Sequence, residues 1–454
     1  MISNQQLLLL KRFDLYNNIA TLEGNEGRLR VEMVIDPYPR IEWDFEILGS
    51  ERLLSRTGIS SGIIQESING YEFKLEDSSL MYSFSSAKGN AFGGVSARAY
   101  SGQRLDTYNE ISFFLPNAKC IATPMTGSLQ QHEYRLMSKP GEKPDLERAF
   151  PRRSMGAGWE CSLNDKWAVR IEFNNDTQNW LKAPESYGTL LTVRGWLKNK
   201  NPDEPHDSEG GVSLSEAKSI LERLCDLLSF ANGGYLGPIV VVGRNRSLQK
   251  EVSVYSAYMT TPIELLSPTW LALQCDLCDY LSCFGSFHHM LQSERWKNLY
   301  VLVLIWYFQA IQPYTAQVRG KPWQIAIVAL AALIERLTYE IVDELTGEKR
   351  TGGPEIRLKR VLGIIGILPS RFDDEYMVDR FFKVRNNALH PVQNKSYPDE
   401  ELELAFDYGV LWVEEIMLWR MGYKGKYRNR LRREGHFVFD APRYDITTRH
   451  SSWV

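Results

Sequence analysis

The sequence predicts a multidomain α+β protein in which a β-rich, sandwich-like amino-terminal half precedes an all-α helical bundle. Three observations lead to this prediction. The chain has 454 residues, 43% of them hydrophobic, which is more than one core needs. Short runs of alternating apolar and polar residues dominate before about residue 262. After about residue 268, apolar residues recur every three or four positions, which is typical of helices.

These patterns divide the chain into four parts. Residues 1–137 are expected to form a β-rich domain, and residues 138–262 a second β-rich or α+β region that packs with the first as a sensor. Residues 263–422 are expected to form the helical bundle, and residues 423–454 a basic tail. Within the second part, residues 138–160 carry three prolines and many charges, which indicates a linker or a long surface loop.

Strands of the amino-terminal half are predicted from alternation between clusters of glycine, asparagine and serine. The candidates are residues 29–46, 71–84, 95–100, 111–114, 167–173, 189–197 and 238–243. Residues 89–94 are glycine-rich but lack the lysine and Ser/Thr of a phosphate-binding loop, so we interpret them as turn chemistry. One helix interrupts the strands: Ser213 is a capping candidate, Glu216 follows three positions later, and the helix extends to Phe230.

Helices of the carboxyl-terminal half are predicted from three- and four-residue apolar spacing. The candidates are residues 270–281, 296–310, 323–345, 356–365, 373–390 and 399–419. Because several connections between them are short, we expect antiparallel neighbours in a bundle.

Charge and hydropathy exclude several classes of function. The formal net charge is −3, so a nucleic-acid partner would have to be held by a local basic patch. The first eleven residues do not have the charge order of a signal or transit peptide. The longest apolar run, residues 299–311, is too short to span a bilayer. We therefore expect a soluble, cytoplasmic protein with no membrane partner.

Six cysteines are scattered along the chain, which suits a reducing compartment. Cys275, Cys278 and Cys283, with His288 nearby, offer four ligands of the kind that hold zinc. However, apolar residues surround them at helical intervals, and there is no glycine-rich turn between the first and last cysteine. We interpret them as small buried side chains, predict no metal or other cofactor, and keep zinc as the weaker alternative.

The sequence around Arg385 and His390 is the strongest functional signal. Pro391 follows His390 directly, and a proline disfavours helical geometry in the residue before it, so the helix should end at about His390. Arg385 then lies one turn inside the helix and His390 at its end. An arginine followed four to six residues later by a histidine also occurs at Arg430/His436 and Arg432/His436, but only in the basic, irregular tail.

Residues 323–419 resemble the HEPN domain family. The likeness lies in AALIERL (331–337), RLKRVL (357–362) and FFKVRNNALHP (381–391), and the segment that contains them covers about a fifth of the chain. A β-rich region ahead of such a bundle resembles the layout of ApeA-type abortive-infection proteins of bacteria. The resemblance implies a metal-independent endoribonuclease that acts in anti-phage defence.

The resemblance also implies the site. Arg385, Asn386 and His390 would form the catalytic group, and Glu335 on a neighbouring helix would buttress the arginine. An arginine matches phosphate oxygens, and a histidine can act as acid or base near neutral pH. One histidine cannot do both tasks at once, whereas a two-fold homodimer through the helical domain would bring two together. RNA, such as tRNA, would be the substrate, and a phage-derived molecule the trigger.

The basic tail offers a further nucleic-acid surface. Its candidate RNA-binding residues are Lys424, Lys426, Arg428, Arg430, Arg432 and Arg433. Tyr423 and Tyr427 are interleaved with them, and basic residues with aromatics suit a phosphate backbone with stacked bases. A solvated surface tail fits the same pattern equally well.

Other functions remain open from the sequence. The bundle can be a catalytically inactive dimerisation or RNA-binding module, with a β-rich half that recognises a protein or ligand. Arg385 and Glu335 would then form a structural ion pair, and His390 would cap its helix. The β-rich half can itself be an enzyme such as a glycan hydrolase, since it contains the carboxylate pairs Glu42/Asp44 and Glu160/Asp165.

Overall fold

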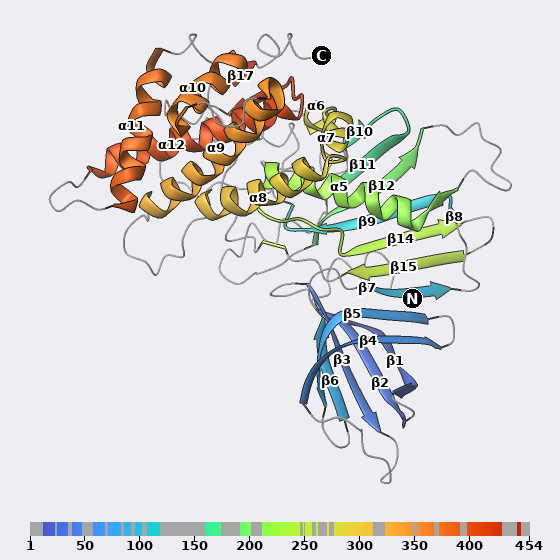
Figure 1. The fold of residues 1–454 in the computed structure, drawn as a ribbon. Helices are drawn as coiled ribbons and strands as arrows, with labels where there is room; N and C mark the ends of the chain where they lie inside the picture. Colours follow the sequence, from blue (N-terminus) through green and yellow to red (C-terminus); the bar gives the residue numbers. More distant parts are fainter. Residues whose placement is uncertain are drawn as a thin grey trace, which may run out of the picture. The chain divides into compact units, whose positions relative to one another are not determined.

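The computed structural model describes part of the chain, in two units. The described residues are 12–22, 25–34, 39–47, 58–68, 71–82, 86–91, 96–101, 107–118, 159–173, 191–200, 211–245, 248, 250–256, 260–261, 270–271, 277–311, 323–347, 352–366, 372–390, 397–428 and 443–445. Those up to Leu228, together with 235–261, form the first unit. Ser229–Gly234 and the residues from Trp270 onward form the second unit (Figure 1).

The first unit is built on an antiparallel sheet. Its strands are β1 (Arg12–Leu22), β2 (Asn25–Val34), β3 (Arg40–Ile47), β4 (Gly58–Ile68), β5 (Tyr71–Tyr82), β6 (Ser86–Ala91), β7 (Ser96–Ser101), β9 (Glu110–Pro116), β10 (Trp159–Ser162), β11 (Trp167–Phe173), β12 (Leu191–Asn199), β14 (Val240–Asn245) and β15 (Lys250–Ser256). In the described part of the chain their order is β1-β2-β3-β6-β5-β7-β15-β14-β9-β12-β11-β10, with β4 paired to β5 off this path.

This topology differs from the sandwich-like arrangement that was expected. The predicted runs all overlap observed strands, although residues 29–46 form two strands, β2 and β3, and strands β1, β4, β6, β10 and β15 were not predicted. Residues 89–91, interpreted as turn chemistry, instead belong to β6 and pair with β3. Hydrogen bonds join all these strands into one continuous sheet. The connection is made by β5, which pairs with β4 along its length, with β6 at its end and with β7 at its start. Alternation shows which residues face a core, and it does not show which strand pairs with which.

Helix α5 (Leu214–Asn232) follows the short strand β13 (Val212–Ser213), which pairs with β8 (Thr107–Tyr108). The predicted cap is confirmed, because the backbone N–H of Glu216 donates to Ser213 Oγ at 3.2 Å. Gly233 has φ +70° and its N–H bonds to the carbonyl of Ser229, so a residue without a side chain ends the helix.

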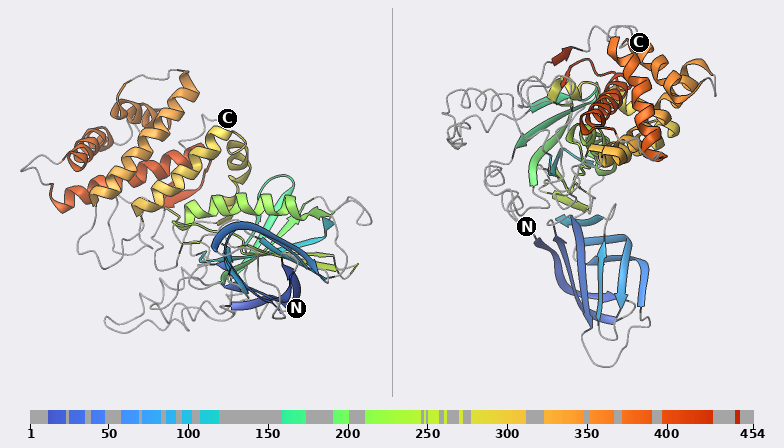
Figure 2. Two further views of the ribbon diagram at one scale, coloured as in Figure 1. Left: turned by 60° about the horizontal axis from the view of Figure 1, so that its bottom comes forward. Right: turned by 90° about the vertical axis from the view of Figure 1, so that its left-hand side faces the viewer.

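The second unit is helical, as predicted. Its helices are α6 (Leu277–Leu281), α7 (Phe284–Met290), α8 (Glu294–Ile311), α9 (Trp323–Thr346), α10 (Pro354–Ile364), α11 (Phe372–Leu389) and α12 (Asp399–Arg420). A short pair of strands, β16 (Lys426–Arg428) and β17 (Arg443–Asp445), follows. Helix α9 contacts α8, α10, α11 and α12, and Figure 2 shows it running through the middle of the helices.

The central position of α9 follows from its sequence. Buried residues occupy most of its circumference rather than one stripe, from Ala326 to Val342. Helix α12 is similarly apolar and reaches α11 closely at Gly409, where a Cβ atom would lie 2.8 Å from Phe381 Cε2. A small residue at this point allows the two helices that flank α9 to touch.

A cluster of buried aromatic side chains forms part of the core of the second unit. Trp270 contacts Tyr280 with ring centroids 4.7 Å apart and Tyr423 with centroids 5.5 Å apart. Phe230, near the end of α5, contacts Trp270 and also Tyr307, the latter at 5.0 Å. Residues 423–427, expected to begin a basic tail, therefore start inside the core.

No helix in the described part of the chain is both long enough and apolar enough to cross a membrane.

Candidate active site

The predicted catalytic group lies where α11 crosses α9. Arg385 is in the last turns of α11, and its Nη2 lies 2.6 Å from Oε1 of Glu335 on α9. Both side chains are partly exposed, 25% for Arg385 and 29% for Glu335. The two residues are fifty positions apart in the sequence, and packing of the helices brings them into an ion pair.

Asn386 provides a second contact for the arginine. Its Oδ1 accepts a hydrogen bond from Nη1 of Arg385 at 2.9 Å, and the side chain is exposed. A guanidinium has five N–H donors in a fixed plane. With one donated to Glu335 and one to Asn386, three N–H groups of Arg385 remain for an anionic ligand.

His390 completes the group at the end of the helix. Helix α11 ends at Leu389, and the backbone N–H of His390 still donates to the carbonyl of Asn386 at 2.9 Å. The predicted helix end is therefore confirmed to within one residue. The side chain is exposed and forms no hydrogen bond or ion pair with the residues that the structure describes. Its ring is accessible for proton transfer.

Packing beneath the site fixes the orientation of α11. Phe381, Phe382 and Val384 are buried, so the opposite side of the helix, with Asn386 and His390, faces outward. Phe381 meets Trp412 of α12 edge to face, with centroids 5.6 Å apart. These apolar contacts anchor the helix that carries the catalytic candidates.

Two ion pairs hold α11 to its other neighbours. Lys359 of α10 lies 2.9 Å from Asp379, and Arg380 pairs with Glu401 of α12. The Arg380 guanidinium also lies over the ring of Tyr397, 5.5 Å from its centre. The hydrogen bond with Glu401 raises the pKa of Arg380, which keeps this pair charged.

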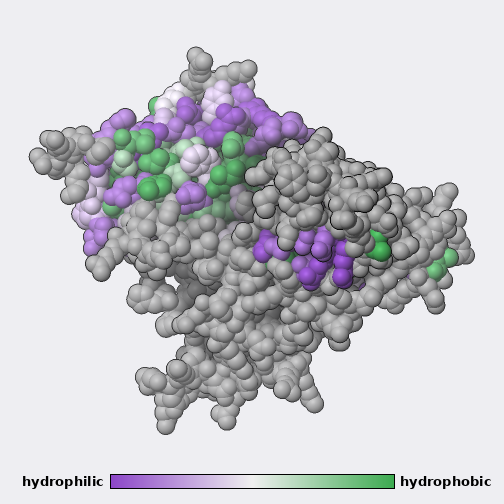
Figure 3. Space-filling view, turned by 90° about the horizontal axis from the view of Figure 1, so that it is seen from below, coloured by the Kyte–Doolittle hydropathy of each residue, from purple (hydrophilic) through white to green (hydrophobic). Residues whose placement is uncertain are grey.

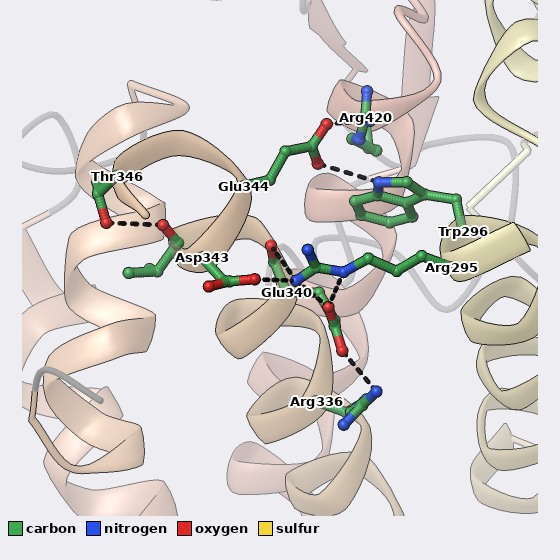
Figure 4. A network of polar contacts seen from close by, with 9 residues as sticks. Arg295, Trp296, Arg336, Glu340, Asp343, Glu344, Thr346 and Arg420 are labelled. Carbon is green, nitrogen blue, oxygen red and sulfur yellow. Dashed lines mark hydrogen bonds and ion pairs between the residues drawn. The ribbon is translucent and has the colours of Figure 1, made fainter. Parts of the chain in front are cut away.

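A polar network joins α8, α9 and α12 along the carboxyl-terminal half of α9 (Figure 4). Arg295 bonds to Glu340 and lies 2.8 Å from Asp343, and Arg336 lies 2.5 Å from Glu340. Burial acts to lower the pKa of Arg295, but the bonds to Glu340 and Asp343 outweigh it and raise that pKa. The buried Glu340 carboxylate is thus neutralised from two sides.

The same network continues through Glu344 (Figure 4). Its carboxylate accepts the indole N–H of Trp296 at 3.0 Å and pairs with Arg420 at 2.9 Å. The Arg420 guanidinium stacks on the Trp296 ring, 4.3 Å from its centre, and burial lowers the pKa of this arginine. The sequence did not predict this network, because its contacts between helices join residues 45 to 76 positions apart and only Arg336–Glu340 has i,i+4 spacing.

The basic residues after α12 divide into two groups. Lys424 is exposed and Lys426 and Arg428 lie in β16, whereas Arg430, Arg432 and Arg433 lie outside the described residues. The two tyrosines between these basic residues were expected to stack on bases, and the structure contradicts this. Tyr423 and Tyr427 are buried, and the Tyr427 hydroxyl bonds to Glu415, because both rings complete the core at the end of α12.

The cysteine cluster does not form a zinc site in the described residues. Cys275 lies outside them, and Cys161 and Cys278 each take part in a disulfide bond, which differs from the expectation of reduced thiols. Burial raises the pKa of Cys283 to about 12, so its sulfur is a neutral thiol. No group of three metal-binding side chains occurs among the residues described.

The carboxylates of the first unit are engaged with basic neighbours. Glu42 bonds to Arg40 at 2.7 Å, and Glu160 lies 3.0 Å from Lys198. The structure therefore gives no specific support to a hydrolase site at Glu42/Asp44 or Glu160/Asp165.

Comparisons with known proteins give little further information. Neither a protein-family model nor a solved structure matches the chain. The chain is similar to the SPbeta prophage-derived uncharacterized protein YopA of Bacillus subtilis (strain 168), with 23% identity over 286 residues. The match covers 59% of this chain and 61% of that protein, so the chain spans about three fifths of its relative.

Proposed function

We propose that this protein is a metal-independent endoribonuclease of the HEPN type. The observation that carries the proposal is the group at the end of α11. Arg385 is held by Glu335 and Asn386 with three N–H groups left over, and an accessible histidine follows one turn later. The bundle of α8 to α12 around α9 would be the HEPN domain.

The proposed reaction needs a cation, a base and an acid. The base takes the proton of the RNA 2′-hydroxyl, whose oxygen attacks phosphorus, while the acid protonates the departing 5′-oxygen as the P–O5′ bond breaks. Arg385 would stabilise the extra negative charge on the phosphorane. The products would be a 2′,3′-cyclic phosphate and a free 5′-hydroxyl. His390 would serve as acid or base.

A homodimer would supply the second histidine. A two-fold axis places the same residues of both chains opposite each other. Helix α8 presents an apolar face with Val301, Leu302, Ile305 and Trp306 exposed, and Figure 3 shows apolar surface on the described helices. Exposed apolar clusters of this kind mark interaction surfaces. We propose that this α8 face contributes to the dimer.

The cellular role that we propose is abortive infection against phage, with the β-rich unit as the sensor that restrains the nuclease. This part rests on the resemblance in layout. The similar protein of Bacillus subtilis is prophage-derived and uncharacterised, and its name specifies no activity. Tests of this role would compare RNA cleavage in expressing cells before and after phage infection.

The direct test is cleavage of total RNA and tRNA by the purified protein in the presence of a metal chelator. We expect His390→Ala and Arg385→Ala to abolish cleavage while circular dichroism stays unchanged. The matched controls are His289→Ala, an exposed histidine on α7, and Arg380→Ala, an arginine of α11 with its own ion pair. Both controls should cleave like the wild type.

Two results would contradict the proposal. Cleavage by His390→Ala at the wild-type rate would make the α11 group structural. RNA binding without cleavage under all conditions, including phage infection, would favour the catalytically inactive module.

A further inference from the structure

The outward face of α11 extends away from the candidate active site toward the start of the helix. Tyr376, Lys383 and His390 are seven residues apart, and all three side chains are exposed. Seven residues are almost two helical turns, so the side chains lie in one row with about 10 Å between neighbours. Each side chain is rotated by about 20° around the helix axis relative to the one before it. We refer to these three residues as the α11 row.

Lys383 differs from the basic residues around it. Arg380, Lys359 and Arg385 are all paired with acids, at Glu401, Asp379 and Glu335 respectively. Lys383 forms no hydrogen bond or ion pair with the described residues. Its ammonium group therefore retains its full charge for an external anion.

The described acid on this side of α11 does not cancel that charge. Asp379 lies one turn before Lys383, and it is neutralised by Lys359, whose Nζ is 2.9 Å from its carboxylate. Toward the other end, Asn386 and Asn387 lie one turn after Lys383 and carry no negative charge. A phosphate can approach Lys383 from the side of His390 without meeting an unpaired carboxylate among the described side chains of α11.

Tyr376 adds an aromatic surface to the row. It is 66% exposed, more than any other large hydrophobic side chain of the described residues. A ring this exposed does not contribute to the core, and aromatic rings on positively charged surfaces serve as platforms for unpaired bases. The bases of a duplex are stacked on each other and cannot reach such a ring.

We propose that the α11 row is a binding track for single-stranded RNA that leads away from the cleavage site. Lys383 would bind a backbone phosphate and Tyr376 would stack on a base. The inference rests on the proposed function, since His390 marks the position of the scissile phosphate.

The experiment measures RNA binding in the full chain with His390→Ala, which prevents cleavage during the assay. Fluorescence anisotropy with a labelled, unstructured RNA oligonucleotide gives affinity as a function of salt. We expect Lys383→Ala to reduce the slope of log affinity against log salt by about 0.7, the value for one lost phosphate contact in a single strand. Lys383→Arg should retain the slope.

Tyr376→Ala should weaken binding by about five- to one hundred-fold, which is the effect of losing one stacked base. Tyr376→Phe keeps the ring and should bind normally. Lys297→Ala, an exposed lysine of α8, is the matched charge control and should leave both affinity and slope unchanged. A duplex RNA competitor should displace the single strand poorly.

The outcomes separate this inference from the nuclease proposal. If the His390→Ala protein binds RNA and both alanine variants bind equally well, the track is wrong while the nuclease proposal stands. Equal competition by duplex RNA would also overturn the single-strand track. If the wild type never cleaves RNA but the variants lose binding as expected, the track stands and the nuclease proposal fails.

Discussion

Arg385 and Arg295 show how the same side chain can be structural or available for function. Arg295 donates to both the carboxylate and the main-chain carbonyl of Glu340 and also pairs with Asp343, so protein acceptors occupy several of its donors. Arg385 gives one N–H to Glu335 and one to Asn386, and its side chain stays partly exposed. Its other three N–H groups have no partner among the described residues, so they are available to bind a phosphate.

The Glu335–Arg385 pair should affect catalysis more than stability. Exposed or half-exposed ion pairs contribute about 1 kcal/mol or less, so Glu335→Gln should leave the melting temperature nearly unchanged. Loss of the fixed guanidinium position should lower the cleavage rate by about ten- to one hundred-fold. Glu294→Gln removes an exposed carboxylate of α8 and serves as the control. Full activity in Glu335→Gln would show that the glutamate does not position the arginine.

Asp226 on α5 should make stability depend on pH. Burial raises its pKa to about 6, although Arg223, 3.3 Å away, acts in the opposite direction. A carboxyl with a raised pKa binds more protons in the folded state than in the unfolded state. The stability that the protonated Asp226 carboxyl contributes is therefore fully present below the pKa of an unfolded aspartate, and it is lost as the pH rises through about 6.

Asp226→Asn should remove this dependence. We expect the variant to gain stability over the wild type at about pH 7 and to lose that advantage at about pH 4, where the wild-type carboxyl is protonated. Thermal unfolding of both proteins at the two pH values tests the prediction, and Asp165→Asn, an exposed aspartate, is the control. A gain of the same size at both pH values would rule out titration of Asp226 as the cause.

At the scale of elements, apolar spacing predicts the helices well. The expected helix at residues 323–345 is observed as α9 (Trp323–Thr346), and that at 399–419 as α12 (Asp399–Arg420). Both are long and strongly periodic, so local sequence is sufficient to define them. Helix α7 (Phe284–Met290) was not predicted, because two turns contain too few residues to show a period.

The contact between α11 and α12 depends on Gly409. A Cβ atom there would lie 2.8 Å from Phe381 and 3.2 Å from Leu330, so Gly409→Ala should force the helices apart and cost about 1–3 kcal/mol of stability. Gly363 on α10 has no atom within 4 Å of its Cβ position. Gly363→Ala should instead stabilise its helix by about 0.5–1 kcal/mol. Chemical denaturation of both variants tests this pair, and a neutral Gly409→Ala would show that the packing can relax.

For the whole molecule, the proposed dimer places a definite demand on α8. Replacing Ile305, which is exposed in the apolar face, with glutamate should favour the monomer, because a charge in an apolar interface is costly. Sedimentation velocity measures the shift from dimer to monomer. The control is Lys297→Glu, which introduces a glutamate on the same helix outside the apolar face. A dimer that persists in Ile305→Glu would place the interface elsewhere.

The sequence by itself determined the local features of this protein: the position of the helices, the cap of α5, and the group Arg385, Asn386 and His390 at the end of α11. These depend on residues close together in the chain, where propensity, periodicity and the stop at Pro391 act directly. The contact of Glu335 with Arg385 was expected from the family resemblance, and the structure shows it. Only the tertiary structure decided that β5 joins the strands into one sheet and that Tyr423 and Tyr427 enter the core. Those outcomes depend on which apolar surfaces bury each other, and a linear pattern specifies that a surface is apolar without specifying its partner.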